Sequence, residues 1–215
     1  MLAILPLWAQ NQLFISGGLH AGFFEKHNKF SDANSFTVKP GYQVGFVFQS
    51  PFPKNNLVFS GSLLLHNTPF RGRLHSLYNT TFFNKYNPHF LQVNSSIGYN
   101  KKLNHGLNLI TKLGPYINYG LFGKAKISGL HPYPDMSISY INRSLLYGDD
   151  YDDDLKKVNW GLLLEASLTI KNKWLPFVSY NHGLSNIRPE VTIIDDRLFI
   201  RSIVVGIRLN MLQKK

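Results

Sequence analysis

The chain has 215 residues, of which 44% are hydrophobic and 14% aromatic, and its formal net charge is +11. This length suits one domain, and no apolar run approaches the roughly 18 residues of a transmembrane helix, so any passage through a membrane must be made by strands. Cysteine is absent, which excludes disulfide scaffolds, thiolate metal sites and cysteine nucleophiles.

The first ten residues, MLAILPLWAQ, form a short apolar run ahead of the first alternating segment. Such a run is typical of the second half of a secretory signal, although a basic start is missing and Leu7 is large for the position three before a cleavage site. We expect a residual signal in residues 1–10 and a single mature domain in residues 11–215. The alternative is an ordinary chain end.

Eight segments of the mature domain alternate between apolar and small or polar residues, as strands do. In chain order they are residues 12–24, 38–49, 57–66, 89–100, 107–121, 158–170, 174–187 and 198–211. The clearest is 158–170, where Trp160, Leu162 and Leu164 share an apolar face and Glu165 lies on the opposite face. Strands of soluble proteins average about 5 to 6 residues, whereas a strand that crosses a hydrocarbon layer needs about 9 to 11, so these lengths indicate a membrane.

Long polar loops alternate with tight turns between these strands. The loops are residues 25–37, 67–87, 122–157 and 188–197. This alternation is typical of outer-membrane barrels, whose long loops are extracellular and whose turns are periplasmic. The sequence therefore predicts an all-β fold, an eight-stranded antiparallel up-and-down transmembrane β-barrel. Its lipid-facing residues should include Leu19, Phe46, Leu63, Val93, Leu113, Leu164 and Val205.

Three charged residues fall on the small-residue, inward face of the predicted strands: Lys112, Glu165 and Arg208. Lys112 and Glu165 each lie about five residues from the turn end of their strands, so at about 3.3 Å per residue they reach a similar height. An unpaired carboxylate among packed side chains is costly. We therefore expect a lumenal charge cluster, the alternative being that trapped water hydrates each group separately.

The predicted turns carry lysines and no acidic residue, which fits a rim beside anionic headgroups. The positive charge is not gathered into one basic stripe with interleaved aromatic residues, so we expect no nucleic-acid partner. The lumen of an eight-stranded barrel is only just wide enough for side chains, so an open diffusion pore is not expected either.

The segments FLQVNSSIGYN, KLGPYINYGLFGK, GLLLEASLTI and IVVGIRLNM resemble the outer-membrane β-barrel family that includes PorT-like proteins. The resemblance covers nearly the whole mature chain, with Gly114-Pro115 and the Tyr-x-x-Gly-Leu of residues 180–184 as its main motifs. It implies a location in the cell outer membrane. PorT-like members are linked to a secretion apparatus, and we do not carry that role over to this chain.

Two chemical interpretations can be weighed against simpler ones. His182, Ser185 and Glu190 are the residue types of outer-membrane lipid A deacylases, but residues three apart on a strand point to opposite faces. An acidic run in the third loop could bind a hard cation, although it lacks the glycine and final glutamate of an EF-hand. The run comprises Asp149, Asp150, Asp152, Asp153 and Asp154. We expect a solvated loop there, and no catalytic residue, metal ion or cofactor.

The expected function is that of a small outer-membrane barrel with a side-chain-filled lumen and long extracellular loops, with a structural or surface-interaction role. Its expected partners are outer-membrane lipid and lipopolysaccharide, with another envelope protein as a further candidate, and we expect a monomer. The first alternative is a soluble lipocalin-like carrier, whose strands would turn their apolar face inward. The second is an outer-membrane enzyme such as a lipid A deacylase. No loop motif chooses among the partners.

Overall fold

The computed structural model describes residues 11–27, 36–52, 55–75, 81–104, 106–130, 138–150, 153–171, 173–189 and 197–212. Within these ranges the chain forms eleven strands. They are β1 (Gln12–His27), β2 (Phe36–Val38), β3 (Pro40–Pro51), β4 (Leu57–Asn67), β5 (Phe70–His75), β6 (Thr81–Asn104), β7 (Leu107–Leu130), β8 (Ile138–Ser144), β9 (Val158–Ile170), β10 (Trp174–Gly183) and β11 (Arg197–Asn210). The described residues contain no helix that is long and apolar enough to span a membrane. The signal expected in residues 1–10 lies outside the described ranges.

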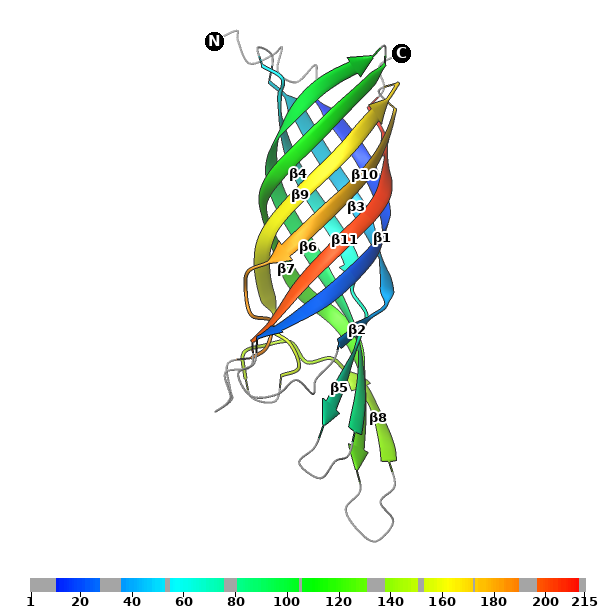
Figure 1. The fold of residues 1–215 in the computed structure, drawn as a ribbon, viewed down its shortest axis with the longest axis vertical. Helices are drawn as coiled ribbons and strands as arrows, with labels where there is room; N and C mark the ends of the chain where they lie inside the picture. Colours follow the sequence, from blue (N-terminus) through cyan, green and yellow to red (C-terminus); the bar gives the residue numbers. More distant parts are fainter. Residues whose placement is uncertain are drawn as a thin grey trace.

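Eight of the strands close into a barrel (Figure 1). Going round the ring, β1, β3, β4, β6, β7, β9, β10 and β11 each pair antiparallel with the next, and β11 pairs with β1 to close it. The closing ladder runs without interruption from Phe14 opposite Asn210 to His27 opposite Arg197. The eight-stranded antiparallel up-and-down barrel predicted from the alternation is confirmed.

The alternation also sets which side chains face outward. On β9, Leu163 is 4% exposed whereas its neighbour Leu164 is 55% exposed. All seven residues expected to face lipid are on the outer surface, with exposed fractions from 48% to 71%. The outer face is thus an apolar band and the inner face is mostly polar, which is the reverse of a soluble carrier barrel.

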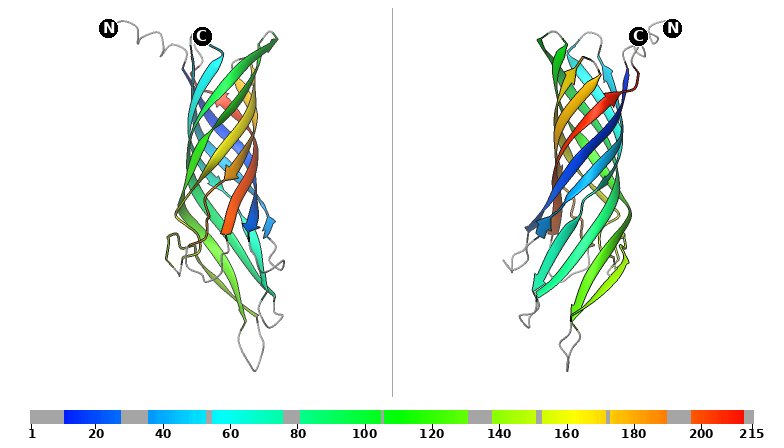
Figure 2. Two further views of the ribbon diagram at one scale, coloured as in Figure 1. Left: turned by 60° about the vertical axis from the view of Figure 1, so that its left-hand side comes forward. Right: turned by 90° about the vertical axis from the view of Figure 1, so that its right-hand side faces the viewer.

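Three short strands and the ends of two long ones continue beyond the ring (Figure 2). β5 pairs with the start of β6, β8 pairs with the end of β7, and β2 pairs with β5. We call this part the protruding sheet: β2, β5 and β8 with residues 81–87 of β6 and 124–130 of β7. It extends from the end of the barrel opposite to the one where β1 begins and β11 ends (Figure 1).

The protruding sheet corrects the predicted loops. Residues 67–87 and 122–157 were expected to be loops, yet they contain β5, β8 and the extensions of β6 and β7. Residues 25–37 likewise contain the end of β1 and most of β2, and β10 ends at Gly183 rather than continuing to Ile187. Away from lipid a strand needs no continuous apolar face, so its alternation is weaker and the pattern is missed.

The barrel interior is filled in three layers. Near the short turns lies an apolar cluster of Phe14, Val47, Leu64, Ile110 and Leu175. At the other end a larger apolar cluster contains Phe70, Phe90, Ala125, Leu145, Leu155, Ile187, Leu198 and Ile200. Between the two clusters lies a middle layer of buried polar and charged side chains, among them His20, His66, Lys112 and Glu165, while other buried polar residues such as Gln49 and Thr169 lie beside the first cluster. Side chains therefore take up the lumen, as expected for eight strands.

Candidate functional site

The three inward charges predicted from the sequence meet in the middle layer. The β-ladder places Lys112 on β7 directly opposite Glu165 on β9, and the Lys112 Nζ to Glu165 Oε1 distance is 3.0 Å. Arg208, on β11, is separated from β9 by β10 and donates to both carboxylate oxygens, with Nη1 to Oε1 at 2.5 Å and Nη2 to Oε2 at 2.6 Å. One carboxylate thus joins two cations across the lumen.

All three groups are shielded from solvent. Glu165 is 4% exposed, Lys112 and Arg208 each 3%. The Arg208 guanidinium also lies 4.1 Å from the centre of the Phe177 ring. An arrangement this buried offers no open position for a substrate. Its physical role is to tie three strands together, because a bidentate arginine on a carboxylate fixes geometry as well as charge.

A second polar chain, which the sequence did not predict, crosses the lumen nearer the protruding sheet. The Thr68 hydroxyl lies within hydrogen-bonding distance of both His20 Nδ1 (3.3 Å) and His66 Nδ1 (3.1 Å). His66 Nε2 is 3.2 Å from the side-chain oxygen of Asn118, whose amide donates to Asn159 at 2.9 Å. Alternating small and polar inward residues indicate that polar side chains face the lumen. Which of them are close enough to form a hydrogen-bonded network depends on the register between strands.

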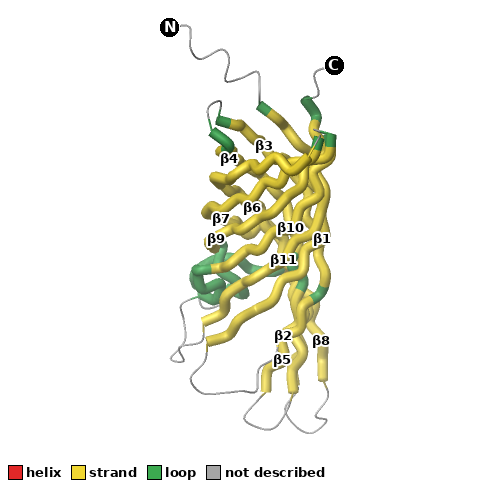
Figure 3. Tube along the Cα trace, turned by 45° about the horizontal axis from the view of Figure 1, so that its top comes forward, coloured by secondary structure: helices red, strands yellow, loops and turns green. Residues whose placement is uncertain are grey.

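The segment between β8 and β9 folds over the mouth of the barrel. Its Leu145 and Leu155 side chains are buried in the larger apolar cluster together with Ile187, which follows β10. Backbone hydrogen bonds hold the segment in place, from Lys156 N–H to Ile187 C=O (2.7 Å) and from Gly120 N–H to Lys157 C=O (2.7 Å). In Figure 3 this segment lies as loop beside the ends of β9 and β10. Apolar side chains from this segment therefore pack together at the mouth.

The acidic run contributes to this closure. Asp154 accepts from Arg143 at 2.6 Å and from the Leu146 backbone N–H at 3.0 Å, while the Asp153 carboxylate accepts from the Asp150 N–H at 2.9 Å. Asp149 and Asp150 are exposed, and Asp152 lies outside the described residues. Across the described part of the chain, no group of three or more His, Asp or Glu could hold a metal ion. The carboxylates here bind the protein's own donors.

The residues considered for deacylase chemistry have other contacts. The Ser185 hydroxyl is engaged by the Trp160 backbone, accepting from N–H at 2.8 Å and donating to C=O at 3.3 Å. His182 Nδ1 lies 3.2 Å from the Tyr180 hydroxyl, and Glu190 is outside the described residues. The positions of His182 and Ser185 therefore give no support to a nucleophile and base pair.

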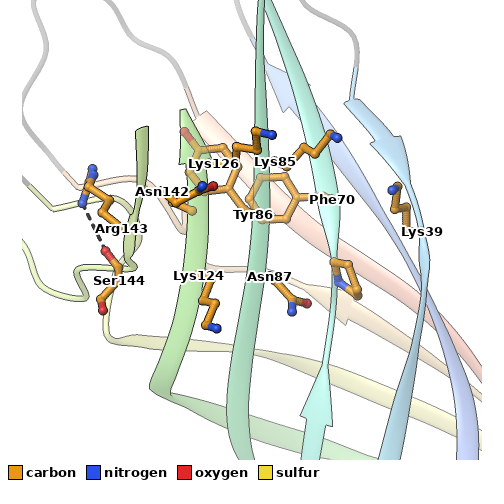
Figure 4. A pocket seen from close by; sticks show the side chains of 12 residues that line it. Lys39, Phe70, Lys85, Tyr86, Asn87, Lys124, Lys126, Asn142, Arg143 and Ser144 are labelled. Carbon is orange, nitrogen blue, oxygen red and sulfur yellow. Dashed lines mark hydrogen bonds between the residues drawn. The ribbon is translucent and has the colours of Figure 1, made fainter. Parts of the chain in front are cut away.

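A basic pocket of about 850 Å³ lies on the protruding sheet (Figure 4). Its lining includes the lysines Lys39, Lys85, Lys124 and Lys126, together with Arg143 and neutral residues such as Asn87, Asn142 and Ser144. None of its lining residues is acidic. The sequence prediction treated the positive charge as dispersed, and here the structure gathers part of it in one place.

Strand register explains the gathering. Arg71 lies opposite Lys85, Lys85 opposite Lys126, and Lys126 opposite Asn142, so one row crosses four strands on a single face. Asn87, Lys124 and Ser144 form the next row. The two-residue spacing of Lys124 and Lys126 was the available sequence signal, but the partners come from separate strands. We call the set Arg71, Lys85, Lys124 and Lys126 the basic face.

The orientation of the barrel can be tested with a single thiol. Because the chain has no cysteine, Asp150→Cys places one exposed thiol beside the barrel mouth. We expect a membrane-impermeant maleimide to label it in intact cells, since long connections of such barrels are extracellular. The control, Lys101→Cys at the opposite end, should be labelled only after the outer membrane is permeabilised. The reverse pattern would contradict the predicted topology.

A family model matches most of this chain. The sequence model of the family described as "Outer membrane protein beta-barrel domain" matches residues 8–188. No curated protein sequence matches the chain. Among solved structures, the chain is similar to OprG from Pseudomonas aeruginosa, with 11% identity, 94% of this chain and 97% of that chain covered, and a TM-score of 0.48.

Two further structures show similar coverage. Ail from Yersinia pestis, solved in complex with the heparin analogue sucrose octasulfate, has 13% identity over 94% of this chain and 99% of that chain, with a TM-score of 0.42. Outer membrane protein W from E. coli has 16% identity over 93% of this chain and 98% of that chain, with a TM-score of 0.41. At these identities the likeness concerns the fold alone.

Proposed function

Because the chain belongs to the outer membrane protein beta-barrel domain family and its barrel lies in the cell outer membrane, we propose that it is a closed barrel with a surface-interaction role. The filled lumen carries this proposal. The ion cluster, the polar chain and two apolar layers occupy the interior, and Leu145, Leu155 and Ile187 close the mouth. With the interior filled, we take the protruding sheet, which extends beyond the barrel, as the described part that contacts a partner.

The same observations argue against the two alternatives. A soluble lipocalin-like carrier is excluded by the outward apolar band and the outer-membrane family. Against an enzyme, the hydroxyl of Ser185 is held by the Trp160 backbone, and the buried Glu165 carboxylate is paired with Lys112 and Arg208. We therefore propose a non-enzymatic role for a monomer surrounded by outer-membrane lipid and lipopolysaccharide.

Within the family, we further propose that the chain lies closest to PorT-like members. The alternating segments 90–100, 112–124 and 161–170 support this placement, and their register in β6, β7 and β9 is that of consecutive barrel strands. No role in secretion is included in the proposal.

A closed lumen has a direct electrical consequence. Reconstituted into a planar lipid bilayer, the purified protein should produce no discrete conductance steps, because packed side chains leave no continuous water path. A general porin in the same bilayer serves as the positive control, and circular dichroism of the same preparation checks that the barrel is folded. Reproducible ion conductance by the folded protein would contradict the closed barrel.

A further inference from the structure

The basic face carries an energetic cost, because no acidic side chain among the described residues is paired with Lys85 or Lys126 in the structure. Arg71, Lys85 and Lys126 lie directly opposite one another on adjacent strands, and like charges in that position are destabilising. Arg71 is the main cause that lowers the pKa of the Lys85 ammonium, followed by burial, Lys126 and Lys39. Among the described residues, the closest pairing in this region, Arg143 with Asp154, involves neither of these lysines. The row is suited to a bound anion.

The location of the basic face narrows the choice of anion. The outward side of β7 is apolar through Leu113 and Ile117, then carries the aromatic residues Tyr119 and Phe122, and then Lys124 and Lys126. Phe122 stacks on His89 of β6 with ring centres 4.5 Å apart. Aromatic residues of this kind mark the edge of the hydrocarbon layer in outer-membrane barrels. At about 3.3 Å per residue, Lys124 lies about 7 Å along the strand beyond Phe122.

The first groups outside the hydrocarbon layer on that side are the phosphorylated sugars of the outer leaflet. Lysine is a compact point charge that suits phosphate, and arginine can bind it through two hydrogen bonds. Asn87, Asn142 and Ser144 add neutral side chains of the kind that bond sugar hydroxyls. Lys126 is held beside the exposed Tyr140 ring, 4.6 Å from its centre, which keeps its charge on this face.

We propose that the basic face binds the phosphate groups of lipopolysaccharide in the outer leaflet next to the barrel. The inference rests on the proposed function, since it gives the surface-interaction role a site and a ligand class. The pocket takes the phosphorylated saccharide, and the apolar band below it contacts the acyl chains of the same lipid. The face of the protruding sheet that carries Arg71, Lys85, Lys124 and Lys126 is thereby held beside the lipid headgroups.

The test compares matched double variants of the full chain in zwitterionic detergent, titrated with deep-rough lipopolysaccharide and followed by native mass spectrometry. The variant Lys85→Gln/Lys126→Gln removes two charges from the basic face. The control Lys101→Gln/Lys102→Gln removes two exposed charges from the opposite end of the barrel. We expect the first to weaken binding about tenfold or more and the control to leave it nearly unchanged. Circular dichroism checks that both variants are folded.

Two further titrations identify the source of the phosphate. Lipopolysaccharide stripped of phosphate by hydrofluoric acid should bind the parent protein as weakly as intact lipid binds the Lys85→Gln/Lys126→Gln variant. Equal binding of intact and stripped lipid, or an equal loss in the control variant, would overturn the site. If soluble inositol hexakisphosphate bound the basic face more tightly than lipopolysaccharide, the lipid source would be wrong.

These outcomes are separate from those that test the closed barrel. Conductance by the parent protein would overturn the proposed closed barrel. It would not change the result of the lipopolysaccharide titration, which measures binding to the basic face. Loss of the phosphate dependence in a non-conducting barrel would overturn only this inference.

Discussion

Replacing Glu165 with glutamine should lower the free energy of unfolding by about 3 to 5 kcal/mol. The substitution keeps the size of the side chain but leaves Lys112 and Arg208 as two buried cations without a counter-charge, 3% exposed each. Breaking a buried ion pair by removing one partner is costly because the remaining charge stays desolvated. The measurement is unfolding in urea in the presence of lipid vesicles.

The geometry also predicts an order between two of the single variants. Lys112→Met should cost less than Glu165→Gln, because Glu165 keeps both hydrogen bonds from Arg208. Replacing all three residues with apolar ones of similar size could be nearly neutral, since a buried ion pair often gains little over its desolvation cost. A double-mutant cycle of Glu165→Gln with Lys112→Met isolates the pairwise coupling. Coupling energies of zero for both Lys112 and Arg208 would refute the cluster as a stabilising unit.

Leu164→Arg should destabilise the protein by about 2 to 4 kcal/mol in bilayers. Leu164 is 55% exposed near the middle of β9, where an outward charge lies in the hydrocarbon layer. The matched control is Ile170→Arg, on the same face at the end of the same strand, where the cost should fall to about 0 to 1 kcal/mol. The assay is the same urea unfolding in vesicles. Equal costs at both positions would show that depth in the bilayer is not the cause.

Strands that contact lipid could be predicted closely from the sequence. β9 begins and ends at the predicted residues, Val158 and Ile170, because its outer face must be continuously apolar and its inner face small or polar. The difference between an apolar outer face and a small or polar inner face also predicted the outward orientation correctly at all seven positions, from Leu19 to Val205. It also placed Lys112 and Glu165 at one height, and in the structure they lie directly opposite each other.

The protruding sheet could not be predicted in this way. In β5 and β8, residues such as Arg71, Asn142 and Ser144 share the outward face with few apolar neighbours, because water rather than lipid surrounds it. No strong alternation then separates a strand from a polar loop. The closing of the mouth by Leu145, Leu155 and Ile187 was missed for a related reason: single apolar residues within polar segments have no periodicity.

The register between strands decides which side chains from separate strands become neighbours. Lys85 and Lys126 are 41 positions apart in the chain by their numbers, and they become neighbours only because β6 and β7 pair antiparallel beyond the ring. Two register shifts, at Lys102/Asn104 and at His89/Phe90, lie between the tight turn and this extension, and the pairing of the two lysines depends on both because the second shift offsets the first. Alternation along one strand reports which face a residue occupies, because lipid and lumen select different side chains. The neighbour across the ladder is set by hydrogen bonding between strands and by such bulges, which only the folded barrel contains.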